Sequence, residues 1–401
     1  MRLSPVLDAL RFHGGSTAGL ARISDLSRAD EQGLTLPLGV RCHDALPQLV
    51  RERIDRNLAD NATRHLRLVE SYREIAETLR AACVEFAVLK GLTRQPYYCA
   101  DLKYRPSYDL DLYCPDIETA GRAQAVLAGL GYGPVHGNEE ADTDHLPRLV
   151  KKTGWTWKGN YFDPEMPLAV EVHFQFWDES GMRFNAGDTG GFWQRRVIRD
   201  VAGMMLPALS AGDALSYAVL HVVRHLLRGA LKLHHVYEMA HFLETSRGDD
   251  GFWNGWAANT CDGIAFRLAG EWFQCEMHPR ARAAVAGLQA DVRWWFEAFG
   301  NSPALIAGNP NKNEIWLHRC LVSCRTDRRA VTLKRLFPAR HGRVVLNPHA
   351  VGRGGVRDRL YALWFLGRRA AFHVATIVTM VPAGLRWLRL RRQPAGGTSA
   401  G

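Results

Sequence analysis

The sequence predicts an α+β fold in which a strand-containing core lies between N-terminal and C-terminal helical regions. Residues 49–82 repeat apolar side chains at helical spacing, residues 83–205 contain strand patterns, and helical periodicity returns over residues 210–333. With 401 residues and 47% hydrophobic content, the chain can bury the core of two or three structural units. We therefore expect four segments: an N-terminal helical region at 1–82, the core at 83–205, a helical domain at 206–333 and a basic tail at 334–401.

The N-terminal region is expected to form a helical cap ahead of the strands. Residues 1–48 are mixed in character, because Gly14, Gly15 and Pro37 interrupt any periodic pattern. From Leu49 to Ala82 the apolar positions predict one long helix or two.

The first predicted strand is short and ends abruptly. Phe86 to Leu89 reads as a buried apolar strand, followed at once by Lys90 and Gly91. A glycine after a strand permits a tight turn and the close approach of a ligand to the backbone. The adjacent lysine offers a charge that can neutralise phosphate.

The most informative pattern is the alternation of Asp109 and Asp111 with Leu110 and Leu112. In an extended strand, side chains two residues apart share a face, so both carboxylates point one way and both leucines point into a core. Two anions held this close favour a cation, and Mg²⁺ prefers oxygen ligands together with substrate phosphates. The alternative is an acidic strand edge that faces solvent.

A helix and a second alternating strand follow. The helix is expected from about Ile117 to Leu130, with Gly131 as a left-handed C-cap. The strand is expected over 168–177, with Glu171 and His173 projecting from one face. If this strand lies beside the Asp-x-Asp strand, Glu171 becomes the third carboxylate of a metal site.

The helical domain carries a histidine pair of uncertain purpose. Asp213 is the expected N-cap of a helix that runs through Leu227. His221 and His225 lie four residues apart on that helix, which is the spacing of a helical zinc pair. His234, His235 and His241 follow along the chain but give no closed ligand set, so a structural or substrate-pocket role is favoured over metal binding.

The positive charge is concentrated in the tail. From Arg319 onward there are 17 Lys and Arg residues and two acidic residues, a net +15; the chain as a whole is +10, so the preceding residues carry −5. This distribution argues against a uniformly basic nucleic-acid-binding enzyme, and no specific nucleic acid is expected as a partner. An apolar run from Ala370 to Leu385, bordered by arginines, predicts attachment to an anionic membrane surface. A helix docked on the protein's own core is the alternative.

The cysteines favour a reducing compartment. Eight cysteines are scattered without a Cys-x-x-Cys pair, so no disulfide framework is evident. The N-terminus lacks a long apolar signal core. We therefore expect a cytoplasmic protein, peripheral to the inner face of the membrane if the tail binds lipid.

The quoted runs resemble an uncharacterised bacterial nucleotidyltransferase family of the polymerase-β superfold. The resemblance rests on Leu89-Lys90-Gly91, on the run Arg105-Pro-Ser-Tyr-Asp109-Leu-Asp111-Leu and on Glu171-Val-His173, and it is strongest over residues 80–180. It implies a small mixed nucleotidyltransferase sheet whose carboxylates bind one or two Mg²⁺ ions. The wider superfold usually has Gly-Ser at the turn where this chain has Lys-Gly.

The resemblance also implies roles for individual residues. Asp109, Asp111 and Glu171 would be metal ligands and, with His173, catalytic residues. Lys90, Gly91 and Arg105 would bind the nucleotide. Arg105 could instead be a surface arginine that pairs with Asp101.

The predicted activity is metal-dependent transfer of a nucleoside monophosphate from an NTP to an unknown acceptor. The acceptor would be a sugar, a lipid-linked intermediate, a peptide or another small molecule, in keeping with polysaccharide or natural-product biosynthesis. Two alternatives remain open. One is an Asp-x-Asp glycosyltransferase, and the other is a non-catalytic, membrane-associated nucleotide-binding protein.

Overall fold

The strands of the protein form one mixed sheet, which confirms the predicted α+β class. The computed structural model describes residues 4–135, 144–302, 312–336 and 356–392. Within them, seven strands pair in the order β3-β4-β5-β2-β1-β7-β6. The strands are β1 Ala87–Val88, β2 Asp109–Tyr113, β3 Tyr132–Pro134, β4 Leu149–Lys151, β5 Ala169–His173, β6 Val197–Val201 and β7 Met204–Ala208. The pairs β2·β5 and β1·β7 are parallel, and the other pairs are antiparallel.

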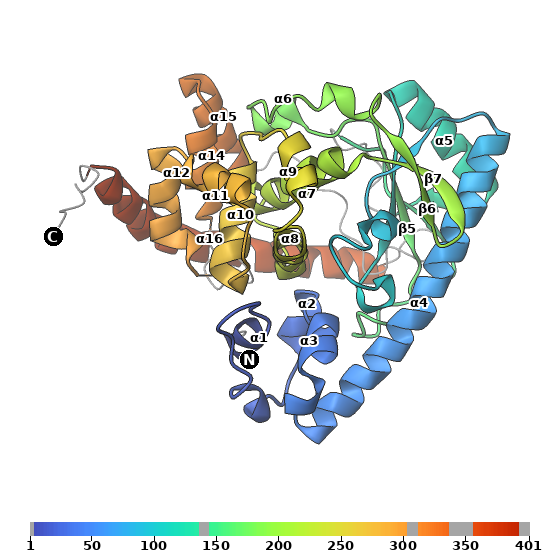
Figure 1. Cartoon of the computed structure of the whole chain (residues 1–401), viewed down its shortest axis with the longest axis horizontal. Coiled ribbons are helices and arrows are strands. Elements are labelled where there is room, and N and C mark those ends of the chain that lie inside the picture. The colour runs from blue at the N-terminus through green and yellow to red at the C-terminus, as the bar shows by residue number, and fades with distance from the viewer. Residues whose placement is uncertain (1–3, 136–143, 303–311, 337–355, 393–401) are drawn as a thin grey trace.

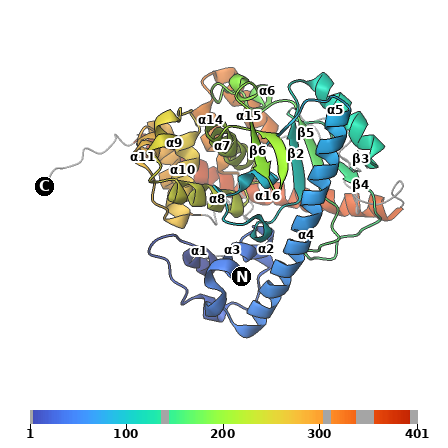
Figure 2. The ribbon, with the colours of Figure 1, turned by 45° about the vertical axis from the view of Figure 1, so that its right-hand side comes forward.

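Two helices cover one face of the sheet. The 34-residue helix α4 (Gln48–Ala81) is a single helix, and it runs past the sheet as a long diagonal in Figures 1 and 2. Its C-terminal half packs with α5 (Ile117–Gly129) and the apolar faces of β2 and β5 in one buried cluster. This cluster includes Tyr72, Ile75, Leu110, Leu112, Leu127, Val170 and Val172. The opposite face of β2 and β5 is thus left for the polar side chains.

The strand expected over residues 168–177 is shorter than the sequence pattern suggests. Strand β5 ends at His173, although alternation continues to Trp177. The physical reason is a separate small core, in which Phe176 stacks on Tyr113 with ring centroids 3.8 Å apart. The apolar residues beyond His173 are thus buried without continuing the ladder.

The helix caps agree with the sequence in one case and differ in another. Helix α5 begins after Asp116, which accepts a hydrogen bond from the Thr119 amide, and Gly131 adopts φ +85° just after the helix, as predicted. Helix α7 (Ala211–Leu227) is capped by Ser210, so the expectation that Asp213 is the N-cap is wrong. Asp213 is the third helical residue, and its carboxylate accepts from the Ser210 hydroxyl at 2.8 Å. Ser210 and Asp213 therefore cap the helix reciprocally. Both serine and aspartate are favoured N-cap residues, so the sequence alone does not decide between them.

A helical layer follows the sheet, and the N-terminal helices pack with it. This layer contains α7, α8 Leu233–Thr245, α9 Asp250–Gly255, α10 Asp262–Phe273, α11 Pro279–Ala286, α12 Ala290–Trp295, α14 Glu314–Leu321 and α15 Arg325–Leu336. The first helices are α1 Ser4–Ala9, α2 Ser27–Glu31 and α3 Thr35–Cys42. Residues 6–54 share one large hydrophobic core with this layer, whereas the second half of α4 belongs to the core of the sheet. The four-segment division of the chain remains a prediction, and the shared core crosses it.

The C-terminal helix α16 (Val356–Arg392) lies across the back of the molecule in Figure 1. Pro382 lies inside this helix, which continues to Arg392. Its last turns dock on the helical layer, because Trp387 is 3% exposed and stacks on Trp316, and Arg391 contacts Asp291. By length and composition alone, Arg359–Arg392 is the one helical stretch in the described residues that could cross a membrane, and 18% of its most apolar window is buried.

Gly91 lets the chain turn directly after Lys90, and this yields a stability prediction. Its φ is +70°, and an added Cβ would lie 2.8 Å from the Tyr72 hydroxyl. That hydroxyl accepts a hydrogen bond from the Asp111 amide at 3.3 Å. Gly91→Ala should lower the free energy of unfolding by about 1–2 kcal/mol or more, from the left-handed conformation alone.

Urea unfolding of Gly91→Ala and Gly121→Ala measures this difference. Gly121 lies inside α5, and an added Cβ meets no atom within 4 Å. Gly121→Ala should therefore stabilise the protein by about 0.5–1 kcal/mol. Equal stabilities for the two variants would contradict the assigned role of Gly91.

Candidate active site

The carboxylates of β2 and β5 meet because the two strands are parallel neighbours in a defined register. Asp111 pairs with Glu171, and Asp109 pairs with Ala169. Neighbouring strands lie about 4.8 Å apart, so the side chains of Asp111 and Glu171 leave the same face side by side. The expectation that Glu171 lies beside the Asp-x-Asp strand is met.

Lys90 lies two residues after the short strand β1, which is antiparallel to β2. Its ammonium group lies 3.1 Å from an oxygen of Asp111 and 3.6 Å from an oxygen of Asp109. Burial lowers the pKa of Lys90, but the charges of Asp109 and Asp111 outweigh burial, and the pKa is raised above that of an ordinary lysine. Lys90 therefore remains charged between the two aspartates.

Asp111 is the most deeply buried of the three carboxylates. Its side chain has no exposed area, and neither oxygen accepts a hydrogen bond from the residues that the structure describes. Burial raises its pKa, but Lys90 and His173 outweigh burial, and the pKa is held below its ordinary value. Asp109 is partly exposed, and burial together with the neighbouring Asp111 raises its pKa. Asp111 thus remains an anion with unused acceptor capacity.

His173 lies beneath the carboxylates. Its Nε2 is 3.5 Å from Asp111 and 3.6 Å from Glu171, and its Nδ1 is 3.8 Å from Asp144. The side chain is 1% exposed. One ligand atom each from Asp111, Glu171 and His173 lies within 4.8 Å of the others, so these residues could hold a metal ion. His173 is therefore positioned to orient the two carboxylates, and its catalytic role remains a prediction.

Sequence reasoning missed Arg148, which contacts Glu171. Its Nε donates to Glu171 Oε1 at 2.8 Å, and a second guanidinium nitrogen contacts the same oxygen. Burial raises the pKa of Glu171, but the neighbouring His173 and the charges of Arg148 and Lys90 hold it well below its ordinary value. The only sequence signal was the position of Arg148 directly before the apolar pair Leu149-Val150, which does not reveal its partner.

A second missed ion pair ties the sheet to helix α7. Asp144 is fully buried and contacts Arg224, and Arg228 lies 3.8 Å from the same carboxylate. The backbone carbonyl of Asp144 accepts hydrogen bonds from the amides of Phe174 and Gln175, directly after β5. The two arginines therefore fix α7 over the end of β5.

Arg105 is buried and paired, and its partner was not foreseen. Its guanidinium donates to Glu238 of α8 at 2.7 and 3.3 Å and to Ser107 at 2.8 Å. The alternative partner Asp101 contacts Lys103 instead. Burial raises the pKa of Glu238, but Arg105 outweighs burial and lowers it. A direct role for Arg105 in nucleotide binding remains a prediction.

Most of these side chains line a common cavity of about 570 Å³ between the sheet and helices α7 and α8, whereas Asp111 and Glu238 are buried and are not part of its lining. Its walls include Lys90, Arg105, Asp109, Glu171 and His173, together with basic residues of α7. Gly91 does not line this cavity; it lies below, against Tyr72. The cavity thus combines oxygen ligands for a cation with positive charge suited to phosphate.

The buried pair of Arg105 and Glu238 gives a stability prediction. Glu238→Gln should destabilise the protein by about 3–5 kcal/mol, because it leaves the charge of Arg105 buried without its partner. The double variant Arg105→Met/Glu238→Met should recover most of this loss. Chemical unfolding compares both with Glu85→Gln, which breaks the exposed contact between Arg196 and Glu85 and should change stability by less than about 0.5 kcal/mol.

Nucleotide binding by the same double variant separates two roles of Arg105. A stable double variant that still binds NTP would show that Arg105 only positions α8. A stable double variant without NTP affinity would show that Arg105 contacts the nucleotide, which would contradict a purely structural assignment.

Comparison with known proteins agrees with this geometry. The sequence model of the family described as "uncharacterised nucleotidyltransferase" matches residues 27–262, more than half of the chain. No curated protein and no solved structure matches the chain. The polymerase-β superfold therefore remains a prediction. The match includes all the carboxylates of the cavity, and the chain belongs to the uncharacterised nucleotidyltransferase family, whose members are enzymes that transfer phosphorus-containing groups from a nucleoside triphosphate.

Proposed function

We propose that the protein moves a nucleoside monophosphate from an NTP to an acceptor, using Mg²⁺ held by Asp109, Asp111 and Glu171. The observation that carries this proposal is the register of β2 and β5, which sets Asp111 beside Glu171. The buried oxygens of Asp111 accept no hydrogen bond from described residues, so a cation fits their unused acceptor capacity.

The chain's own residues have separable tasks. Lys90 carries a positive charge between Asp109 and Asp111 and would meet the outer phosphates of the nucleotide. Arg148 holds Glu171 ionised, and His173 orients Asp111 and Glu171 from below. When bound, Mg²⁺ would supply charge stabilisation at the phosphates and would make the acceptor hydroxyl more acidic.

The proposed reaction is an in-line displacement at the α-phosphorus. The acceptor oxygen forms a bond to this phosphorus while the bond to the bridging oxygen breaks, and pyrophosphate leaves with that oxygen. The proton of the acceptor hydroxyl passes to Glu171 or Asp111 as the general base. The acceptor would be a sugar, a lipid-linked intermediate, a peptide or another small molecule of polysaccharide or natural-product biosynthesis in the cytoplasm.

The two alternatives have less support. A metal-dependent glycosyltransferase normally has a sizeable βαβ nucleotide-binding region before its Asp-x-Asp motif. In the described part of this chain, β1 is the only strand before Asp109, and it follows one long helix. A non-catalytic nucleotide-binding protein does not require the complete set of Asp109, Asp111 and Glu171.

Asp111→Asn tests the proposal, because it removes a charged ligand with little change in volume. Pyrophosphate release from the four common NTPs, measured with Mg²⁺ and extract of the native cell, should fall by roughly 100-fold or more. Mass spectrometry of the same mixtures identifies the nucleotide-modified acceptor. Asp200→Asn on β6 is the matched control, since Asp200 is exposed and remote from the cavity lining, and it should retain full activity.

Thermal unfolding of both variants checks that the fold is retained. Undiminished pyrophosphate release and product formation by a folded Asp111→Asn protein would rule out the proposed role of Asp111. Glu171→Gln should lower kcat more than nucleotide affinity if Glu171 accepts the proton.

We also propose that the exposed part of α16 rests on an anionic membrane. Before its docked end, this helix exposes large apolar side chains together with arginines. The exposed apolar residues are Val356, Leu360, Leu363, Trp364, Leu366, Phe372, Val374, Val378, Val381 and Leu385. Such a surface suits the headgroup boundary, where each arginine contributes about 1 kcal/mol at low salt.

Sedimentation with vesicles containing anionic lipid tests this attachment. Trp364→Glu/Val378→Glu should abolish binding, because it places two charges on the apolar surface of α16. Leu333→Glu is the control, since Leu333 of α15 is 57% exposed on a different helix. Release by high salt indicates surface attachment, extraction by detergent alone would indicate insertion, and no binding of the full chain at low salt would refute the proposal.

A further inference from the structure

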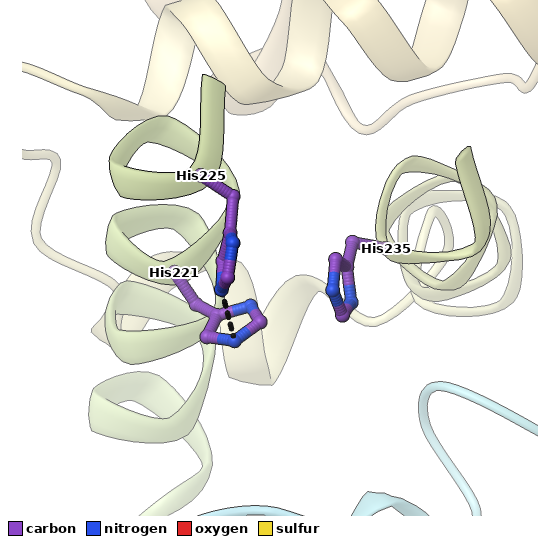
Figure 3. A group of neighbouring side chains, drawn as sticks. All are labelled: His221, His225 and His235. Carbon is purple, nitrogen blue, oxygen red and sulfur yellow. Dashed lines mark hydrogen bonds between the residues drawn. The ribbon is translucent and has the colours of Figure 1, made fainter. Parts of the chain in front are cut away.

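Three histidines converge at the wall of the cavity, opposite the carboxylates. His221 and His225 project from one side of α7, and His235 faces them from the first turn of α8 (Figure 3). The ring centroids lie 4.3 Å apart for His221 and His225, 4.5 Å for His221 and His235, and 5.3 Å for His225 and His235. The third histidine of the group therefore comes from the neighbouring helix, although the sequence spacing indicated no closed ligand set.

The ring nitrogens are spaced closely enough for one metal ion. One nitrogen from each ring lies within 4.8 Å of the other two, and the Nε2 atoms of His221 and His225 are 3.1 Å apart. Two nitrogens bound at about 2.0–2.1 Å to a tetrahedral zinc ion lie roughly 3.4 Å from each other. The pair on α7 lies close to this spacing, and a nitrogen of His235 lies within 4.8 Å of both.

The buried surroundings of the three rings favour the form of histidine that binds metal. Burial lowers the pKa of His225 to about 3 and holds the pKa values of His221 and His235 well below the ordinary histidine value. Neutral imidazole is the form that ligates metal, and burial favours that form at all three rings. The Nδ1 of His225 has no hydrogen-bond partner among the described residues.

The surroundings define the type of site. His221, His225 and His235 line the same cavity as Asp109 and Glu171, so a metal bound by the three rings keeps a coordination position open to that cavity. Three protein ligands and one open position are typical of catalytic rather than structural zinc sites. Imidazole favours zinc and related transition metals, whereas carboxylates favour Mg²⁺.

We propose that His221, His225 and His235 bind one zinc ion, separate from the Mg²⁺ of the carboxylates and open to the same cavity. The ligand set stands on its own geometry. A role for the zinc ion in binding the acceptor oxygen at its open position would rest on the proposed nucleotidyl transfer.

Metal analysis of the full-length protein tests the site without an activity assay. Protein stripped with a chelator and dialysed against micromolar Zn²⁺ should retain about one equivalent, measured by plasma mass spectrometry, and calorimetry gives the affinity. His225→Ala and His235→Ala should each weaken zinc binding by about 100-fold or more. His241→Ala is the control, because His241 lies on the same helix but contacts the Tyr97 carbonyl, and it should bind like the wild type.

Two further measurements keep the outcome decisive. Substitution of Co²⁺ into the wild-type protein should give the intense visible absorption of a tetrahedral site with imidazole ligands, which does not depend on any variant folding. Asp111→Asn should lose nucleotidyl transfer but retain zinc, so failure of one proposal is distinguishable from failure of the other. Absence of bound Zn²⁺ in the wild type, no such Co²⁺ spectrum, or unchanged affinity in a folded His235→Ala protein would each overturn the zinc site.

Discussion

The candidate active site depends on compensation of the buried charge on Asp111. A carboxylate without exposed area is costly unless a positive charge and polar groups surround it. Lys90 supplies that charge from the end of β1, and the antiparallel pairing of β1 with β2 brings its ammonium group within 3.1 Å. The turn at Gly91 and the hydroxyl of Tyr72 hold this strand end in place. A lysine at the end of a strand therefore has a structural task before any ligand binds.

Pairs of opposite charges also stabilise the sheet and join it to the helical layer. Arg148 contacts Glu171 within the sheet, Arg224 of α7 contacts Asp144, and Arg105 contacts Glu238 of α8. Each contact links segments that are distant in the chain. The cavity between the sheet and the two helices is therefore framed by ion pairs, and its shape depends on their remaining intact.

The sequence predicted the local features well because they follow from side-chain period and chain direction. Alternation placed Asp109 and Asp111 on one face, and the parallel register added Glu171. The N-cap of α7 shows the limit of local reasoning. Ser210 and Asp213 are hydrogen-bonded to each other, and only the backbone conformation shows that Ser210 is the N-cap.

Long-range partners were not predictable from spacing, since Arg105 and Glu238 are 133 residues apart. The sequence interpretation that His235 completes no ligand set could not take account of tertiary packing, because its approach to His225 depends on how α8 packs against α7.

The most direct test of the account is a crystal structure with Mn²⁺ and a non-hydrolysable NTP analogue, measured at a wavelength where manganese scatters anomalously. The account predicts an anomalous peak bonded to oxygens of Asp109, Asp111 or Glu171 and to the phosphates, with Lys90 near the outer phosphates. A nucleotide bound elsewhere, or a cavity in which Lys90 still pairs with Asp111 and no peak lies beside the carboxylates, would contradict it.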